Sequence, residues 1–132
     1  MAAGKYSFVI EQGTTVKFEI QYKDSNGQPV DLTGYNAKMQ IRSGFANSSP
    51  TTYLTLSSSL NSDGTGLNMA GSSGLNPPTS GTIGINISPY TSSLLTFDTA
   101  YYDLEIQSGS GTSYAVNRLL EGQVRLSKQV TD

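Results

Sequence analysis

Two carboxylates at positions 103 and 105 are the residues best suited by type and spacing to chemistry. Asp103 and Glu105 alternate along one predicted strand, so both side chains lie on the same face, about 7 Å apart. That separation lies within the range used by the acid and base pair of glycosidases. A solvated strand face explains both residues equally well, and nothing nearby indicates a sugar-distorting cleft. We therefore predict no catalytic residue and no enzymatic activity.

Three short acidic segments resemble known site motifs without completing them. Asp24-Ser25-Asn26-Gly27 and Asn61-Ser62-Asp63-Gly64 resemble the first half of a calcium loop but lack its third oxygen ligand and its closing bidentate Glu. Asp31-Leu32-Thr33-Gly34 departs from the aspartic-protease signature at its Leu. The glycines from 64 to 84 lack the strand and helix that flank a phosphate cradle. Each segment is typical of a turn or a flexible connection, so we predict no metal and no cofactor.

The chain holds eight Tyr but only four Phe. Tyr53, Tyr90, Tyr101 and Tyr114 are placed where a ring could stack on a sugar or lie in a protein interface. Ordinary half-buried positions in a sheet explain most of them. The excess over Phe still favours surfaces that bind something.

Composition excludes several classes of function. The 132 residues fit one domain, and Cys, His and Trp are absent, which removes thiol and imidazole catalysis. Eight basic residues against ten acidic ones give no field that would attract nucleic acid. No apolar run is long enough for a membrane span or a signal peptide, so we expect neither membrane nor conventional secretion.

The elements that position these residues show the period-two alternation of half-buried strands. It is clearest over 16–22, 37–41, 83–87 and 100–106. The alternation predicts an inward face formed by Val16, Phe18, Ile20, Met39, Ile41, Leu54, Ile83, Ile85, Tyr102, Leu104, Ile106, Val116 and Val124.

Breaks between the strands are equally marked. Residues 57–81 form a long Ser/Gly/Pro-rich stretch that we interpret as a partly mobile loop, with a brief strand pairing at 67–69. Ser88-Pro89 predicts the start of a single helical turn. The adjacent pair Leu119-Leu120 interrupts the last strand, which predicts a β-bulge near Glu121-Gly122.

These patterns predict an all-β fold: a two-sheet antiparallel sandwich, immunoglobulin-like in architecture, with seven to eight strands and one short helical turn. The paired Cys and core Trp of immunoglobulin domains are missing. We predict a single domain over 1–132, with the long loop at 57–81.

Three segments in order carry a resemblance to known proteins: Gln-Gly-Thr-Thr at 12–15, Lys-Asp-Ser-Asn-Gly-Gln-Pro-Val-Asp-Leu-Thr-Gly-Tyr at 23–35, and Arg-Leu-Leu-Glu-Gly-Gln-Val at 118–124. Together they resemble small phage virion proteins. The first two are similar to the N-terminal domain of siphophage baseplate upper proteins, in which a β-sandwich anchors receptor-binding machinery to the tail. The third is similar to the end of short tail or neck-associated proteins.

The resemblance implies a non-catalytic structural protein of the virion, an adaptor in the tail, baseplate or fibre. Its partners would then be other virion proteins and copies of itself, with no nucleic acid and no membrane. A capsid decoration protein is an alternative within the structural class. A carbohydrate-binding β-sandwich that presents tyrosines to a glycan is the alternative in another class, although the absence of Trp counts against it.

Overall fold

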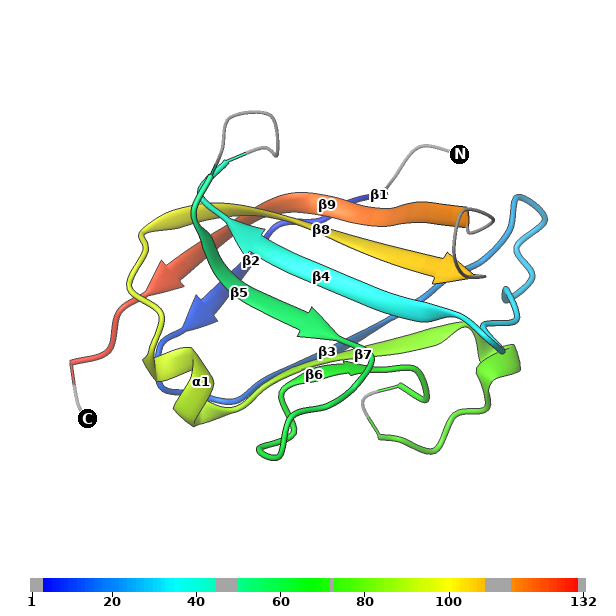
Figure 1. The fold of residues 1–132 in the computed structure, drawn as a ribbon, viewed down its shortest axis with the longest axis horizontal. Helices are drawn as coiled ribbons and strands as arrows, with labels where there is room; N and C mark the ends of the chain where they lie inside the picture. The colour runs from blue at the N-terminus through cyan, green and yellow to red at the C-terminus, as the bar shows by residue number, and fades with distance from the viewer. Residues whose placement is uncertain (1–3, 45–49, 72, 109–114, 131–132) are drawn as a thin grey trace.

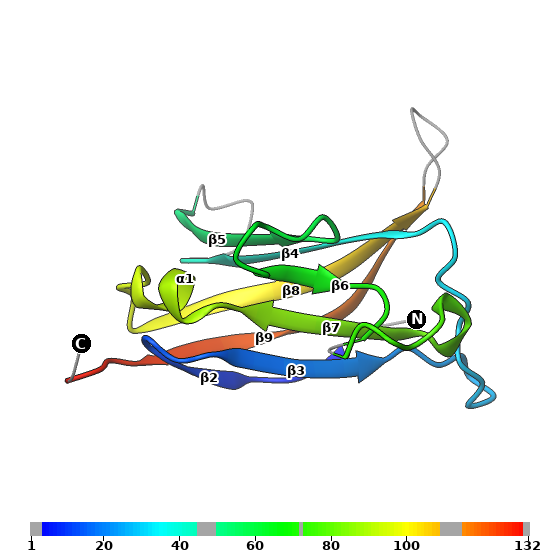
Figure 2. The ribbon, with the colours of Figure 1, turned by 90° about the horizontal axis from the view of Figure 1, so that it is seen from below.

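The computed structural model describes residues 4–44, 50–71, 73–108 and 115–130, which fold as a β-sandwich. The predicted all-β class is confirmed, with one short helix and a 3₁₀ turn at Pro78–Ser80 among these residues. The described strands number nine and not the predicted seven to eight. Figures 1 and 2 show two sheets packed face to face, with helix α1 (Pro89–Ser93) at one end. The larger sheet contains β1 (Gly4–Lys5), β2 (Phe8–Glu11), β4 (Asn36–Arg42), β5 (Thr52–Ser57), β8 (Thr99–Ser108) and β9 (Ala115–Ser127), and the smaller contains β3 (Val16–Gln21), β6 (Gly66–Asn68) and β7 (Thr82–Ile87).

The N-terminal strands depart from the predicted antiparallel arrangement. The larger sheet has the order β1-β9-β8-β4-β5, and both β1 and β2 pair with β9 in parallel. The turn after β2 leads into β3 of the other sheet and does not return as a hairpin, so β2 is left to pair with the C-terminal strand. Gly122 permits the close approach, because a Cβ there would lie 2.1 Å from the carbonyl oxygen of Tyr6.

The interior between the sheets confirms most of the predicted inward face. Met39, Ile41, Ile83, Ile85, Tyr102, Leu104, Ile106 and Val124 are buried, while Val16, Phe18, Ile20 and Leu54 are half-buried against them. Burying each such aliphatic side chain contributes about 1.5–3 kcal/mol.

The prediction for Val116 is wrong, because its side chain is 43% exposed. Leu104 pairs with Leu120 and Glu105 pairs with Arg118, so Leu119 is an extra residue on β9. This β-bulge lies two to three residues before the predicted position. One extra residue reverses which face later residues occupy, so Val116 and Val124 cannot both point inward.

The segment 57–81 contains more regular structure than the predicted loop. The brief pairing is confirmed as β6, which runs antiparallel to β7 with Leu67 opposite Ile85. Leu67 is fully buried, and Thr65, two residues before it, is buried as well. The stretch therefore contributes to the core at its centre and crosses the surface on either side.

An acidic side chain holds this segment against helix α1. Ser88 is the N-cap of the helix, as predicted, and its hydroxyl accepts a hydrogen bond from the Thr91 amide. The Asp63 carboxylate accepts from the Ser88 hydroxyl at 2.6 Å, the Thr91 hydroxyl at 2.8 Å and the Thr65 amide at 3.0 Å. These bonds, the one from Ser88 foremost, hold the pKa of Asp63 well below its ordinary value of 3.8.

Replacing Asp63 with asparagine is expected to remove part of the acid sensitivity of folding. The pKa of Asp63 is lower in the folded state than in the unfolded state, so its carboxylate stabilises the fold at pH values above the unfolded-state pKa. This stabilisation is lost as the pH falls through the folded-state pKa. The difference in unfolding free energy between the wild type and Asp63→Asn should therefore shrink as the pH falls below about 4. Urea titrations at several pH values measure it. A difference that stays constant down to strongly acidic pH contradicts the role given to the carboxylate.

Candidate functional site

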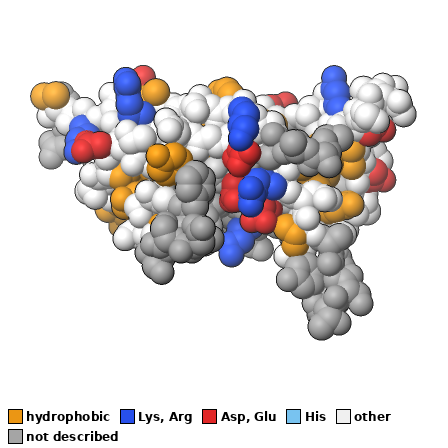
Figure 3. Space-filling model, turned by 90° about the horizontal axis from the view of Figure 1, so that it is seen from above, with side chains coloured by type: hydrophobic (Ala, Val, Ile, Leu, Met, Phe, Trp, Pro, Cys, Tyr) orange, Lys and Arg blue, Asp and Glu red, His pale blue; other side chains and the backbone are white. Residues whose placement is uncertain are grey.

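The outer face of the larger sheet carries a hollow of about 400 Å³. Strand β8 pairs with β4 on one side and β9 on the other, so outward side chains of three strands lie in rows across this face. Figure 3 shows acidic and basic side chains gathered at its centre. We call this the outer-face hollow; its lining includes Lys5, Gln40, Arg42, Tyr101, Asp103, Glu105, Arg118, Glu121 and Gln123.

Ion pairs hold one end of the hollow together. Asp103 and Glu121 lie opposite each other on β8 and β9, an arrangement that destabilises a sheet unless a cation intervenes. Arg118 intervenes, with its Nε 3.3 Å from Asp103 Oδ2 and its Nη1 3.6 Å from Glu121 Oε2. The bulge at Leu119 makes this possible, because it places Arg118 on the same face as Glu121.

Lys5 of β1 completes the ion-pair network by donating a hydrogen bond to Glu121. That bond, helped by the positive charges of Lys5 and Arg118, lowers the pKa of Glu121 against the opposing effect of burial. The carboxylate therefore stays ionised at neutral pH, and it ties the N-terminal strand to β9.

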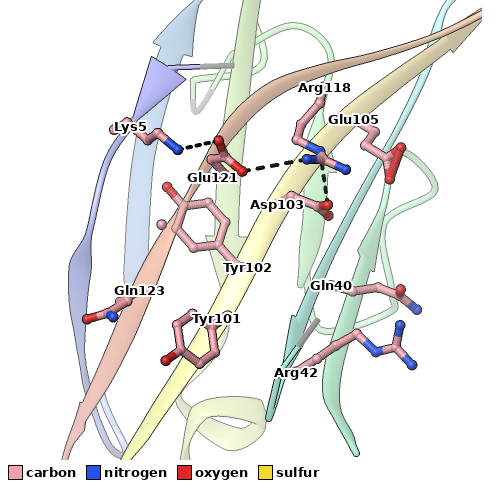
Figure 4. A pocket seen from close by; sticks show the side chains of 12 residues that line it. Lys5, Gln40, Arg42, Tyr101, Tyr102, Asp103, Glu105, Arg118, Glu121 and Gln123 are labelled. Atoms are coloured by element: carbon pink, nitrogen blue, oxygen red, sulfur yellow. Dashed lines mark hydrogen bonds and ion pairs between the residues drawn. The ribbon is translucent and has the colours of Figure 1, made fainter. Parts of the chain in front are cut away.

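Further polar side chains complete the lining of the hollow. Figure 4 shows Glu105 beside Arg118, which lies opposite it on β9, whereas Tyr101, Arg42 and Gln123 lie in one row beyond Asp103. The Gln40 amide donates a hydrogen bond to the Thr55 hydroxyl at 3.3 Å. Among the described residues, Glu105 has no ion-pair partner. The Arg42 guanidinium donates one hydrogen bond, from Nη2 to the Pro50 carbonyl at 3.5 Å, and its buried Nε has no acceptor in the described part of the chain.

The pair Asp103 and Glu105 lies on one face, as the alternation predicted, and both side chains line the hollow. Asp103 is engaged by Arg118, and Glu105 lies opposite Arg118 on β9 and Lys38 on β4. Sequence reasoning missed Gln40, Arg42 and Gln123 as neighbours of this pair. The alternation of Lys38, Gln40 and Arg42 marked them as outward residues, but their place beside Tyr101 depends on which strands pair.

The acidic segments at 24–27 and 31–34 are turns, as predicted. Asp24 Oδ1 accepts from the amides of Asn26 and Gln28 at 2.9 and 3.0 Å. Asp31 Oδ1 accepts from the Thr33 hydroxyl at 2.6 Å and the Thr33 amide at 2.9 Å, and these bonds lower the pKa of Asp31. Both carboxylates therefore bond to their own turns.

The four singled-out tyrosines lie in different places. Tyr101 lines the hollow, Tyr53 stacks on Phe97 with ring centroids 4.9 Å apart, and Tyr90 is exposed on α1. Tyr114 lies outside the described residues. Of the three tyrosines that the structure describes, Tyr101 alone lines the hollow.

A second hollow lies between the N-terminal strands of the two sheets. It is lined by Tyr6, Phe8 and Val9 from β2 and its approach, and by Val16 and Phe18 of β3, among others. Phe8 packs on the Phe18 and Tyr102 rings at 5.1 Å. Tyr6 and Val9 remain about half exposed, which leaves apolar surface at this margin.

Within residues 4–44, 50–71, 73–108 and 115–130, no three acidic side chains gather closely enough to hold a metal ion. No helix in those ranges is long and apolar enough to cross a membrane. No family model matches the chain, and no curated protein matches it either.

Proposed function

We propose that this chain is a non-catalytic structural protein of a phage virion, an adaptor of the tail, baseplate or fibre. It acts by contact with copies of itself and with other virion proteins, in virions assembled in the host cytoplasm. The resemblance of its three segments to virion proteins implies a β-sandwich, and the chain has that fold. A part of this kind would present surfaces at fixed distances, which a two-sheet core can provide.

The observation that carries the proposal is the pair of free strand edges at one margin of the sandwich. Figure 2 shows β2 and β3 along this margin, and among the described strands β2 pairs only with β9 and β3 only with β7. An edge strand with free amides and carbonyls pairs readily with another chain unless charges block it. Val9 is half exposed on β2, and the flanking charges are one of each sign, Glu11 and Lys17. In a dimer with a two-fold axis, Glu11 of each copy can lie opposite Lys17 of the other copy.

Replacing Val9 with lysine is expected to weaken self-association. The substitution places a positive charge on the free edge of β2, and because Val9 is 50% exposed the fold should tolerate it. We expect the wild-type chain to exceed its monomer mass of 14.0 kDa in concentrated solution, and the dissociation constant to rise about tenfold or more in the variant. Size-exclusion chromatography with light scattering measures both.

Leu75→Lys is the matched control, because Leu75 is also an exposed apolar residue but belongs to the connection after β6 and not to β2 or β3. It should associate like the wild type. A wild-type chain that stays monomeric at about millimolar concentration overturns self-assembly through this margin. Binding of the monomer to purified capsid proteins, and not to tail or baseplate proteins, would favour the decoration alternative.

A further inference from the structure

The turn at residues 24–27 carries an asparagine followed directly by a glycine. Of the eight asparagines in the sequence, Asn26 alone has glycine as its next residue. The turn follows β3 and lies at the end of the sandwich opposite α1 (Figures 1 and 2), and residues 23–29 are all exposed. Water therefore reaches both the side chain of Asn26 and the peptide bond that follows it.

An asparagine in this position can lose ammonia through attack by its own backbone. The Gly27 nitrogen gives up its proton and forms a bond to Cγ of Asn26, while the side-chain amide nitrogen leaves as ammonia. Water then opens the resulting succinimide ring at either carbonyl, which yields aspartate or isoaspartate. The whole reaction consumes one water and releases one ammonia. Glycine favours it, because no Cβ hinders the approach of the nitrogen.

The folded turn leaves the reacting groups accessible to each other. Within the described part of the chain, the hydrogen bonds of Asn26 and Gly27 come from their backbone amides, and none holds the Asn26 side chain. A Cβ added at Gly27 would meet no atom within 4 Å, so no other segment packs on this peptide bond. The Gly27 amide donates to the Asp24 carbonyl at 3.0 Å. Breaking that one exposed hydrogen bond should slow the attack by about tenfold at most.

The pair Asp63-Gly64 provides a contrast within the same molecule. Its glycine amide donates to the Asn61 carbonyl at 2.9 Å, so the backbone turn is similar to that at 24–27. An aspartate side chain cyclises mainly when it is protonated, because its hydroxyl then leaves as water. Three hydrogen bonds keep the Asp63 carboxylate ionised and hold it in place. This second pair should therefore stay unmodified in the folded protein.

We propose that Asn26-Gly27 is a modification site, at which Asn26 converts without an enzyme to aspartate and isoaspartate in the folded protein. Isoaspartate adds a methylene group to the backbone and moves the Gly27 amide away from the Asp24 carbonyl. Both products place a second carboxylate near that of Asp24, which accepts from the amides of residues 26 and 28. The protein therefore gains one negative charge and a looser turn as it ages. The reaction takes place within one chain, so it does not depend on the proposed function.

Incubation of the full chain in warm, mildly alkaline buffer tests the proposal. Ion-exchange chromatography separates the more acidic product, and peptide mapping by mass spectrometry locates it. We expect the modification at Asn26, at a rate within about tenfold of that of the same chain unfolded in guanidinium chloride. Isoaspartyl methyltransferase should label the product. Amide hydrogen exchange at residues 24–28 should be faster in the isolated isoaspartate form than in the unmodified chain.

Two variants at the same position serve as controls. Asn26→Gln keeps the amide but would have to close a larger ring, so it should accumulate no acidic species over the same period. Asn26→Asp should elute with the acidic product from the start. The proposal is overturned if Asn26 stays intact in the folded chain after the unfolded chain has converted completely. Equal conversion at Asp63-Gly64, or acidification of Asn26→Gln at the wild-type rate, overturns it as well.

Discussion

Leu67→Ala is expected to lower the free energy of unfolding by about 3 kcal/mol, within the range for fully buried Leu replaced by Ala. Leu67 has no exposed surface and lies opposite Ile85 on the antiparallel strand β7. The truncation removes apolar contacts and leaves a cavity that paired strands cannot easily close. Urea denaturation followed by circular dichroism measures the loss.

Leu75→Ala provides the matched control within the same Ser/Gly/Pro-rich segment. Leu75 is 86% exposed, so its truncation should change the unfolding free energy by no more than about 0.5 kcal/mol. Equal and small effects of the two substitutions would mean that 57–81 is a loop throughout, as the composition predicts. A large effect at Leu67 alone would mean that this segment supplies part of the core.

Gly122→Ala is expected to destabilise the fold by about 3 kcal/mol, because the added methyl group collides with backbone and not with a flexible side chain. Its Cβ would lie 2.1 Å from the Tyr6 carbonyl oxygen and 2.8 Å from the carbonyl carbon. That oxygen accepts a hydrogen bond from Tyr102, and the Tyr6 amide donates to the Glu121 carbonyl at 3.0 Å. Relieving the collision therefore means moving the N-terminal strands away from β9. Chemical denaturation and the rate of proteolysis at residues 4–11 measure the two consequences.

Gly4→Ala tests whether the effect is specific to this close approach. Gly4 lies on the same N-terminal arm, but a Cβ there would meet mainly the end of the flexible Leu120 side chain at 3.3 Å. Its effect on stability should be within about 0.5 kcal/mol. If Gly4→Ala and Gly122→Ala destabilise the chain equally, the parallel contact at Tyr6 does not limit the packing of β9.

Strands with strict alternation could be predicted from the sequence, because one face of each is buried and the other solvated. Strands β3, β4 and β8 follow this rule, whereas in β7 Thr82 and Gly84 are buried as well as the alternating isoleucines. The outward position of Val116 could not be predicted from alternation alone, since a single extra residue at Leu119 reverses the face. The adjacent leucines signal the irregularity, but only pairing with β8 shows which one is extra.

The outer-face hollow was predictable only in part. Asp103 and Glu105 share a strand, so their common face follows from the period of two. The neighbours Arg42 and Gln123 belong to strands about 60 residues before and 20 residues after them, and nothing local to those residues indicates which strand lies beside which. The parallel pairing of β2 with β9 was missed for the same reason, because it depends on contacts across nearly the whole chain.

That parallel pairing has a consequence for the order of events during synthesis. Lys5 and Glu121 are 116 residues apart, so on the ribosome the first strands emerge on the order of ten seconds before their partner is made. Through that interval Ile10, fully buried in the finished sandwich, has no β9 to pack beside. Contacts this distant in sequence also slow folding after release. On a crowded polysome, the unpaired β1 and β2 of one nascent chain can meet the completed β9 of a neighbouring chain. Exchange of N-terminal strands between copies then competes kinetically with pairing within one chain.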